Sequence, residues 1–115
     1  MAEVNQRFPF QKLDIYGCAR ELAVAVAEAR IRHAELRDQA ERAAMSAFLT
    51  LAEGLPNERP AMRSKYFTES NNSLHEVVAA VDLPSALAAI DQSSLTRIEN
   101  LAFRFRGMLI KLHGR

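Results

Sequence analysis

The segment from Ala43 to Ala52 places the strongest constraint on how this chain folds. Only Ser46 and Thr50 are polar in it, so a helix here is apolar around almost its whole circumference. A helix that is buried on one side normally has a polar opposite face. In a chain of 115 residues, one side of this helix can face the core and the other side needs a second cover. The segment therefore predicts self-association.

The outward side of this helix is expected to contact another subunit, together with part of the last helix. The predicted interface residues are Met45, Phe48, Leu49, Ala52, Phe103 and Ile110. Arg42 and Glu53 stand at the two ends of the apolar segment. Either they pair with charges of another helix or subunit, or they are ordinary solvated charges.

Length and charge limit the classes of function. A single domain is expected at 115 residues, and 15 basic against 14 acidic residues leave the chain nearly neutral. A nucleic acid or an anionic membrane would therefore need a local basic patch. The single cysteine excludes an internal disulfide, and no apolar run approaches the length of a membrane span. The first ten residues carry no signal-peptide pattern, so we expect a cytoplasmic protein.

Apolar residues recur every three or four positions in four segments, which is typical of amphipathic helices. The predicted helices run from Leu13 to about Arg30, from about Leu36 to Gly54, from just after Asn57 to about Asp82, and from Leu95 to Leu112. Residues 1–10 are expected to form a flexible arm, and residues 11–113 the folded domain. Such helices with short connections predict an all-α fold, an antiparallel up-down-up-down four-helix bundle.

The sequence gives a clear break signal for the second connection between helices but none for the first. No proline or glycine lies between Arg30 and Arg37. The first turn is placed near Ile31 to His33 only because one uninterrupted helix would be too long. Gly54 followed by Pro56 is a typical helix end.

The third connection is marked by proline. The third helix is expected to be capped by Asn57 and to stop before Pro84, which lacks the N–H that a helix interior needs. One short turn over Ser85 to Ile90 should follow. Asp91 or Ser93 is expected to cap the last helix.

Four hydroxyl side chains fall on or near packing faces of the two middle helices: Ser46, Thr50, Ser70 and Ser73. A buried hydroxyl either bonds to the carbonyl one turn back or reaches a neighbouring helix. We expect the local bond in most cases.

The residues that could carry chemistry are scattered. None of His33, His75 and His113 follows a glutamate by three positions, so the di-iron bundle signature is absent and no metal or cofactor is expected. His75 and Glu76 are adjacent and point in different directions on a helix. Cys18 lies beside an apolar face and is expected to be a buried small side chain. No acid, base and nucleophile converge, so the chain is not expected to be an enzyme.

The last helix carries a basic stripe, because Arg97, Arg104 and Lys111 are spaced by seven residues. Phe103 and Ile110 run beside the stripe. A basic stripe with an aromatic neighbour is typical of a nucleic-acid surface and equally of a charged interface rim. The predicted nucleic-acid contacts are Arg97, Arg104, Arg106 and Lys111. The near-neutral chain favours the solvated or rim alternative.

Several short motifs occur in the order in which one known family carries them. The strongest is Arg42-Ala43-Ala44-Met45-Ser46 followed by Leu51-Ala52-Glu53-Gly54, and others are Phe10-x-x-Leu13, Ser73-Leu74-x-Glu76 and Gly107 to Leu112. From about Phe10 to Leu112, the chain resembles the bacterial four-helix bundle proteins known as 23S rRNA intervening-sequence proteins. Phe48 and Thr50 replace the family's proline and asparagine in the strongest motif.

The resemblance implies a homo-oligomer, commonly a pentameric ring, without a known catalytic activity. A similar bundle is the accessory protein of diversity-generating retroelements, which is strongly basic and binds nucleic acid and a reverse transcriptase. This chain has a net charge of only +1. The predicted function is a non-enzymatic scaffold or adaptor that binds copies of itself, and the alternative is a nucleic-acid-binding module.

Overall fold

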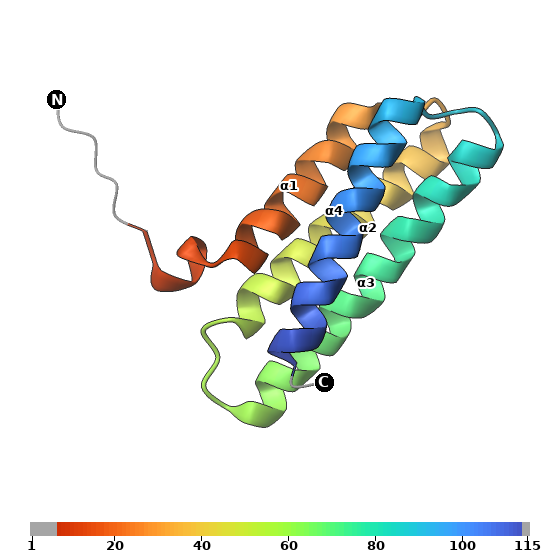
Figure 1. Ribbon diagram of the computed structural model, residues 1–115. Coiled ribbons are helices and arrows are strands. Elements are labelled where there is room, and N and C mark those ends of the chain that lie inside the picture. The colour runs from red at the N-terminus through yellow and green to blue at the C-terminus, as the bar shows by residue number, and fades with distance from the viewer. Residues whose placement is uncertain (1–6, 114–115) are drawn as a thin grey trace, which may run out of the picture.

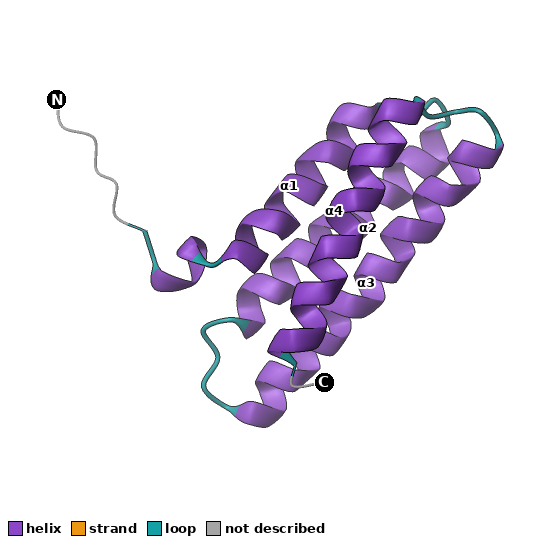
Figure 2. Cartoon of the chain, viewed as in Figure 1, coloured by secondary structure: helices purple, strands orange, loops and turns teal. Residues whose placement is uncertain are grey.

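The computed structural model describes residues 7–113, which form four α-helices preceded by a short 3-10 helix. These elements are η1 (Pro9–Lys12), α1 (Asp14–Ala29), α2 (Ala34–Gly54), α3 (Pro60–Ala86) and α4 (Gln92–Leu112). The long helices run alternately up and down and lie side by side as an antiparallel bundle (Figures 1 and 2). The predicted all-α four-helix bundle is confirmed.

The core consists of the apolar stripes that the helical spacing indicates. The stripe residues that are buried are Ile15, Ala19, Leu22 and Val26 on α1, Ala40, Ala43, Ala47 and Leu51 on α2, Phe67, Ser70, Leu74, Val77 and Val81 on α3, and Leu95, Ile98, Ala102, Phe105 and Leu109 on α4. Leu36 and Leu112 are half-buried. Each helix packs against two neighbours, and α2 with α3 is the most extensive pair, whereas α3 with α4 is the least extensive of the four.

Small residues explain the close packing of α2 against α3. Alanines occupy most of the buried face of α2. At the end of this helix, a Cβ atom added to Gly54 would lie 2.8 Å from the ring of Phe67 and 2.9 Å from the Cβ of Tyr66. No side chain fits at that separation. Gly54 therefore allows the two helices to approach.

Hydroxyl groups also connect α2 with α3. The Ser70 hydroxyl donates to the Ala47 carbonyl at 2.7 Å, and the hydroxyls of Ser46 and Ser73 lie 2.8 Å apart. Only Thr50 bonds to the carbonyl one turn back, that of Ser46, at 2.7 Å. The expectation that local bonds predominate is wrong, because the small side chains bring the second helix within reach.

The first turn lies where it was expected. Helix α1 ends at Ala29, and Arg30 adopts a left-handed conformation with φ 49°. Helix α2 starts at Ala34, where the His33 ring accepts a hydrogen bond from the Leu36 N–H at 3.2 Å. The left-handed Arg30 ends the first of these helices, and the His33 cap begins the second. Neither proline nor glycine is involved.

Helix α3 continues through Pro84, so the prediction that proline ends it is wrong. It reaches Ala86 instead of Asp82. The missing N–H of Pro84 costs one helical hydrogen bond, and burial of the Pro84 ring in the bundle offsets this loss. The true end is a Schellman motif, in which Ala88 is left-handed with φ 57° and the Ala89 N–H donates to the Pro84 carbonyl at 2.7 Å.

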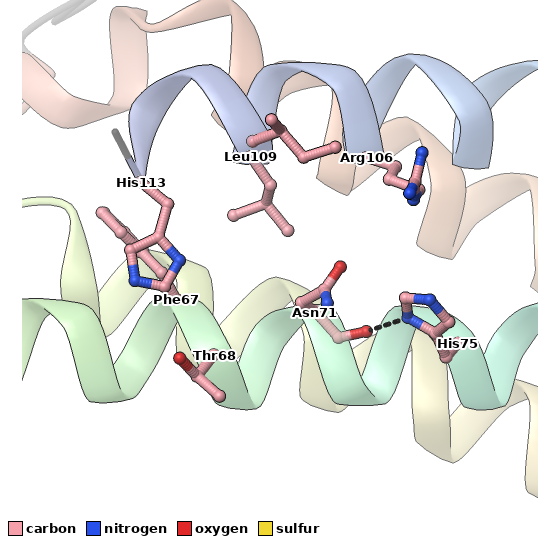
Figure 3. Close-up of a pocket in the computed structure, with 8 residues that line it drawn as sticks. Phe67, Thr68, Asn71, His75, Arg106, Leu109 and His113 are labelled. Atoms are coloured by element: carbon pink, nitrogen blue, oxygen red, sulfur yellow. Dashed lines mark hydrogen bonds between the residues drawn. The ribbon is translucent and has the colours of Figure 1, made fainter. Parts of the chain in front are cut away.

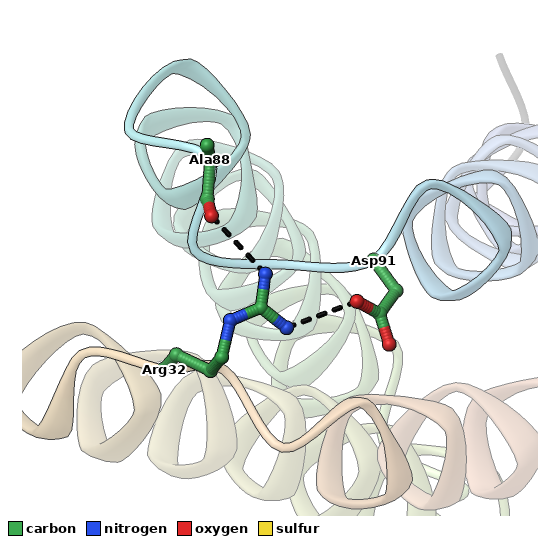
Figure 4. A network of polar contacts seen from close by, with 3 residues as sticks. All are labelled: Arg32, Ala88 and Asp91. Atoms are coloured by element: carbon green, nitrogen blue, oxygen red, sulfur yellow. Dashed lines mark hydrogen bonds and ion pairs between the residues drawn. The ribbon is translucent and has the colours of Figure 1, made fainter.

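Two loops at one end of the bundle are joined by Arg32 (Figure 4). Its guanidinium lies 2.9 Å from the Asp91 carboxylate and donates to the Ala88 carbonyl at 3.1 Å. Its backbone N–H donates to the Ala89 carbonyl at 2.8 Å. Asp91 occupies the N-cap position of α4, but its side chain does not cap the helix. The expected capping bond is therefore replaced by the contact with Arg32.

At the start of α3, too, the residue predicted to cap the helix makes a different contact. Arg59 is its N-cap residue, Pro60 is its first residue, and the Asn57 side chain accepts a hydrogen bond from the Arg59 N–H at 2.9 Å. Asn57 thus shapes the loop before the helix. Of the predicted arm over residues 1–10, residues 1–6 lie outside the described residues, and Pro9 and Phe10 belong to η1.

Ala88→Gly is expected to stabilise the protein by about 0.5–1 kcal/mol. A left-handed alanine costs roughly 1–2 kcal/mol, which exceeds the roughly 0.4–1 kcal/mol of unfolded-chain entropy that glycine adds. Urea unfolding followed by circular dichroism measures the difference. Ala27→Gly, at an exposed position inside α1, is the control and should destabilise by about 1 kcal/mol.

Candidate interaction surfaces

The outer face of α2 carries a short apolar row, the α2 ridge, which consists of Met45, Leu49 and Ala52. In the single chain 55% of the Met45 surface and 51% of the Leu49 surface are exposed, and Ala52 is half-buried. Steps of three and four residues keep all three on one face of the helix. The predicted interface residues of α2 therefore form a continuous surface, except for Phe48.

Phe48 lies on the side of α2 that faces α1. Its ring is 5.0 Å from that of Tyr16, which is 5.5 Å from that of Phe10. Phe8 extends this row at 6.1 Å from Phe10 and is largely exposed. The row anchors η1 to the bundle. The sequence pattern did not indicate it, because its members come from three separate elements.

A groove runs between α3 and α4, with a volume of about 570 Å³. We call it the α3/α4 groove. Its apolar walls include Val78 and Phe103, and Phe103 is 77% exposed. Asp82, Glu99 and Arg106 add charges along its length. Phe103 was predicted as an interface residue, but it lies on a different side of the bundle from the α2 ridge.

A second hollow of about 310 Å³ continues from the groove toward the end of α4. Figure 3 shows Asn71 and His75 of α3 facing Arg106 of α4, with His113 at the far end. The His75 ring donates to the Asn71 carbonyl at 2.8 Å. Ile110, the last predicted interface residue, is half-buried in this hollow. Phe103 and Ile110 thus border one surface.

The predicted nucleic-acid contacts divide between two sides of α4. Arg97 lies 2.6 Å from the Glu28 carboxylate of α1. Arg104 and Lys111 also border hollows on the α1 side. Arg106 borders the α3/α4 groove instead. Arg104 also borders an open hollow together with Phe103. The basic stripe therefore stays beside this aromatic ring, whereas Arg106 lies apart from the stripe.

Two further basic residues accompany Arg104, and sequence reasoning did not include them. Arg7 and Lys12 border the same hollow, whose volume is about 560 Å³. Asp14 and Glu21 border it too. The N-terminal basic residues carry no helical periodicity that would link them to α4, so only the fold brings them together.

The model of the 23S rRNA-intervening sequence protein family matches residues 11–111. The chain belongs to this family. A search of curated proteins found no significant match.

The strongest resemblance to this family has a structural explanation. Ala43, Ala44 and Gly54 are buried at contacts of α2, and Ser46 bonds across to α3. These positions therefore serve the packing of α2. At the position of the family's proline, Phe48 packs on Tyr16.

Within residues 7–113, no group of three His, Cys, Asp or Glu side chains is placed to hold a metal ion. No helix in the same range is both long and apolar enough to span a bilayer.

Cys18 is a buried thiol, as expected from its position beside an apolar face. It is 5% exposed, and its Sγ donates to the Leu101 carbonyl at 3.5 Å. Burial raises the pKa of this thiol, the nearby Arg104 charge lowers it, and the Glu21 charge raises it. The net effect is a raised pKa, so the unreactive protonated form is favoured.

Alkylation of Cys18 by iodoacetamide is expected to be slow at neutral pH. Because the thiol pKa is raised, the rate should reach its plateau at a higher pH than that of a cysteine peptide. Arg104→Gln should shift the plateau to still higher pH, and Glu21→Gln should shift it to lower pH. A rate that follows the peptide curve would contradict the assignment.

Proposed function

We propose that this protein is a non-enzymatic scaffold that assembles with copies of itself through the α2 ridge and part of α4. The observation that carries the proposal is the exposure of Met45 and Leu49 on one apolar face of a helix that is also apolar on its core side. Contiguous exposed apolar surface on a small domain marks an interaction site. The assembly needs no metal or cofactor.

Family membership supports the same function. The resemblance stated above implies a ring, commonly of five subunits, and we propose such a ring here. A cytoplasmic location fits the one cysteine, Cys18, which is a free buried thiol.

The test is the mass in solution of the wild type and of Leu49→Glu. Wild type should exceed the mass of one chain by light scattering, and Leu49→Glu should be a monomer with unchanged helicity, because an unpaired interfacial charge is costly. Val24→Glu is the control, since Val24 is an exposed apolar residue of α1. It should assemble like wild type. A monomeric wild type would refute the scaffold.

Nucleic-acid binding is the second candidate function, and the juxtaposition of Arg7, Lys12 and Arg104 around one hollow favours it. Three cations from two parts of the chain border this hollow together with two carboxylates, those of Asp14 and Glu21, which leaves a small local excess of positive charge. Phosphate contacts of this kind are strongly salt-dependent.

Titration with RNA and with single-stranded DNA at several salt concentrations tests this candidate. The predicted contact set is replaced by alanine in one variant: Arg97, Arg104, Arg106 and Lys111. Affinity should fall with salt in the wild type and be weaker in this variant. Absence of binding at low salt would remove the candidate. An unchanged affinity of the variant would exclude the predicted contact set on α4.

A further inference from the structure

We propose that the α2 ridge of one copy packs into the α3/α4 groove of the next copy, so that every subunit contributes two different surfaces to the assembly. This inference rests on the proposed self-association and adds which surfaces meet. The partner is a second copy of this chain, and the order of charges along the two surfaces identifies it.

The residues that line the groove form three layers, each with one residue of α3 opposite one residue of α4. The two helices are antiparallel, and along both of them the lining residues follow at steps of four and then three positions. From one end to the other, the layers are Asp82 with Glu99, Val78 with Phe103, and His75 with Arg106. The first layer is acidic, the second is apolar, and the third contains the arginine. A complementary surface must present a cation, an apolar segment and an anion in that order.

The α2 face presents this order. Arg42 comes first, Met45 and Leu49 follow, and Glu53 comes last, and both charged residues are exposed. Arg42 and Glu53 are about 16 Å apart along the axis, and the outer groove layers are about 10 Å apart. The difference is about 3 Å at each end. Long side chains such as those of arginine and glutamate bridge such a gap.

These charges are available for a partner. The ion pairs among residues 7–113 are those of Arg32 with Asp91 and Arg97 with Glu28. The charged residues of the two surfaces make none within that range: Arg42, Glu53, Asp82, Glu99 and Arg106. Complementary charges at the ends of an apolar contact fix its register and direction.

The positions of the two surfaces determine the kind of symmetry. Helices α2 and α4 lie diagonally in the bundle (Figure 1), so the ridge and the groove face different sides. A contact between two different surfaces is heterologous, and it produces a ring or a filament instead of a two-fold dimer. The ridge of every subunit is then covered by the groove of its neighbour.

The test uses two variants that each lose one surface. Leu49→Glu keeps the groove, and Phe103→Glu keeps the ridge. Each variant alone should have the mass of a single chain, with the helical content of wild type. An equimolar mixture should form a complex of two chains, because one intact ridge and one intact groove remain. Light scattering and analytical ultracentrifugation measure these masses.

The outcomes separate this inference from the proposed scaffold. If wild type assembles and Phe103→Glu assembles equally well, the pairing of ridge with groove is overturned and the scaffold stands. The same holds if the mixture of variants stays monomeric. If wild type is a monomer, the scaffold fails and this inference fails with it.

A charge exchange tests the register without placing a charge in the apolar layer. Arg42→Glu and Glu99→Arg should each raise the dissociation constant of the assembly about tenfold, because like charges then meet at one end. The double variant should return to within a few-fold of wild type. Arg20→Glu, on the exposed side of α1, is the control and should have no effect. Failure of the double variant to recover would overturn the proposed register.

Discussion

Phe105→Ala is expected to lower the free energy of unfolding by about 3–5 kcal/mol, because it removes a large side chain and leaves a cavity between the helices. The Phe105 side chain is 0% exposed, and it is one of the two largest fully buried side chains. Urea unfolding monitored by circular dichroism measures the loss. The protein concentration should be low enough for wild type to be a single chain, since assembly would add to the apparent stability.

Phe103→Ala is the matched control for this prediction. It makes the same chemical change two positions away on the same helix, but the Phe103 side chain is 77% exposed. Its effect on the unfolding free energy of the single chain should stay within about 0.5 kcal/mol. Equal losses for the two variants would contradict the placement of Phe105 in the core and Phe103 at the groove.

Gly54→Ala should destabilise the protein by about 1–3 kcal/mol, although alanine is the better helix former. The added Cβ would lie 2.8 Å from the Phe67 ring and 2.9 Å from the Tyr66 Cβ, so α2 and α3 would have to move apart. Thermal unfolding gives the sign directly as a lower melting temperature.

The control for this substitution is Gly107→Ala in α4. A Cβ atom added at Gly107 meets nothing within 4 Å, so only the helix propensity changes. This variant should be more stable than wild type by about 1 kcal/mol. If both glycine variants were stabilised, close packing of α2 on α3 at Gly54 would be disproved.

Periodicity was sufficient to predict the helices and their buried faces. All members of the three-four alternation of α4, from Leu95 to Leu109, are buried in the structure, and Leu101 is buried in addition. Helix boundaries were less predictable where they depend on backbone conformations that the residue type does not suggest. Arg30 and Ala88 adopt the left-handed conformation that glycine usually provides, so neither end carried a recognisable signal.

The candidate surfaces were predictable only where they lie on one helix. Met45 and Leu49 stood out because their segment of the helix is apolar around almost its whole circumference. The α3/α4 groove depends on how two helices pair, and Val78 and Asp82 have no distinctive pattern within α3. The basic stripe was recognised as a set, yet Arg97 is paired with Glu28, a residue distant in sequence. Surfaces and ion pairs that join different helices could therefore not be predicted from the pattern along one helix.

The uneven packing of the four helices has a mechanical consequence. The hairpin of α2 and α3 is held by small residues and by hydroxyl bonds, and forms a stiff spine. The seam between α3 and α4 is the least extensive of the four, so fewer contacts oppose a small rotation of α4 against α3 than oppose a rotation at the other seams. In the proposed assembly, a subunit that is stiff along one edge and compliant along another would tolerate small changes of angle toward its neighbour while its own shape is preserved.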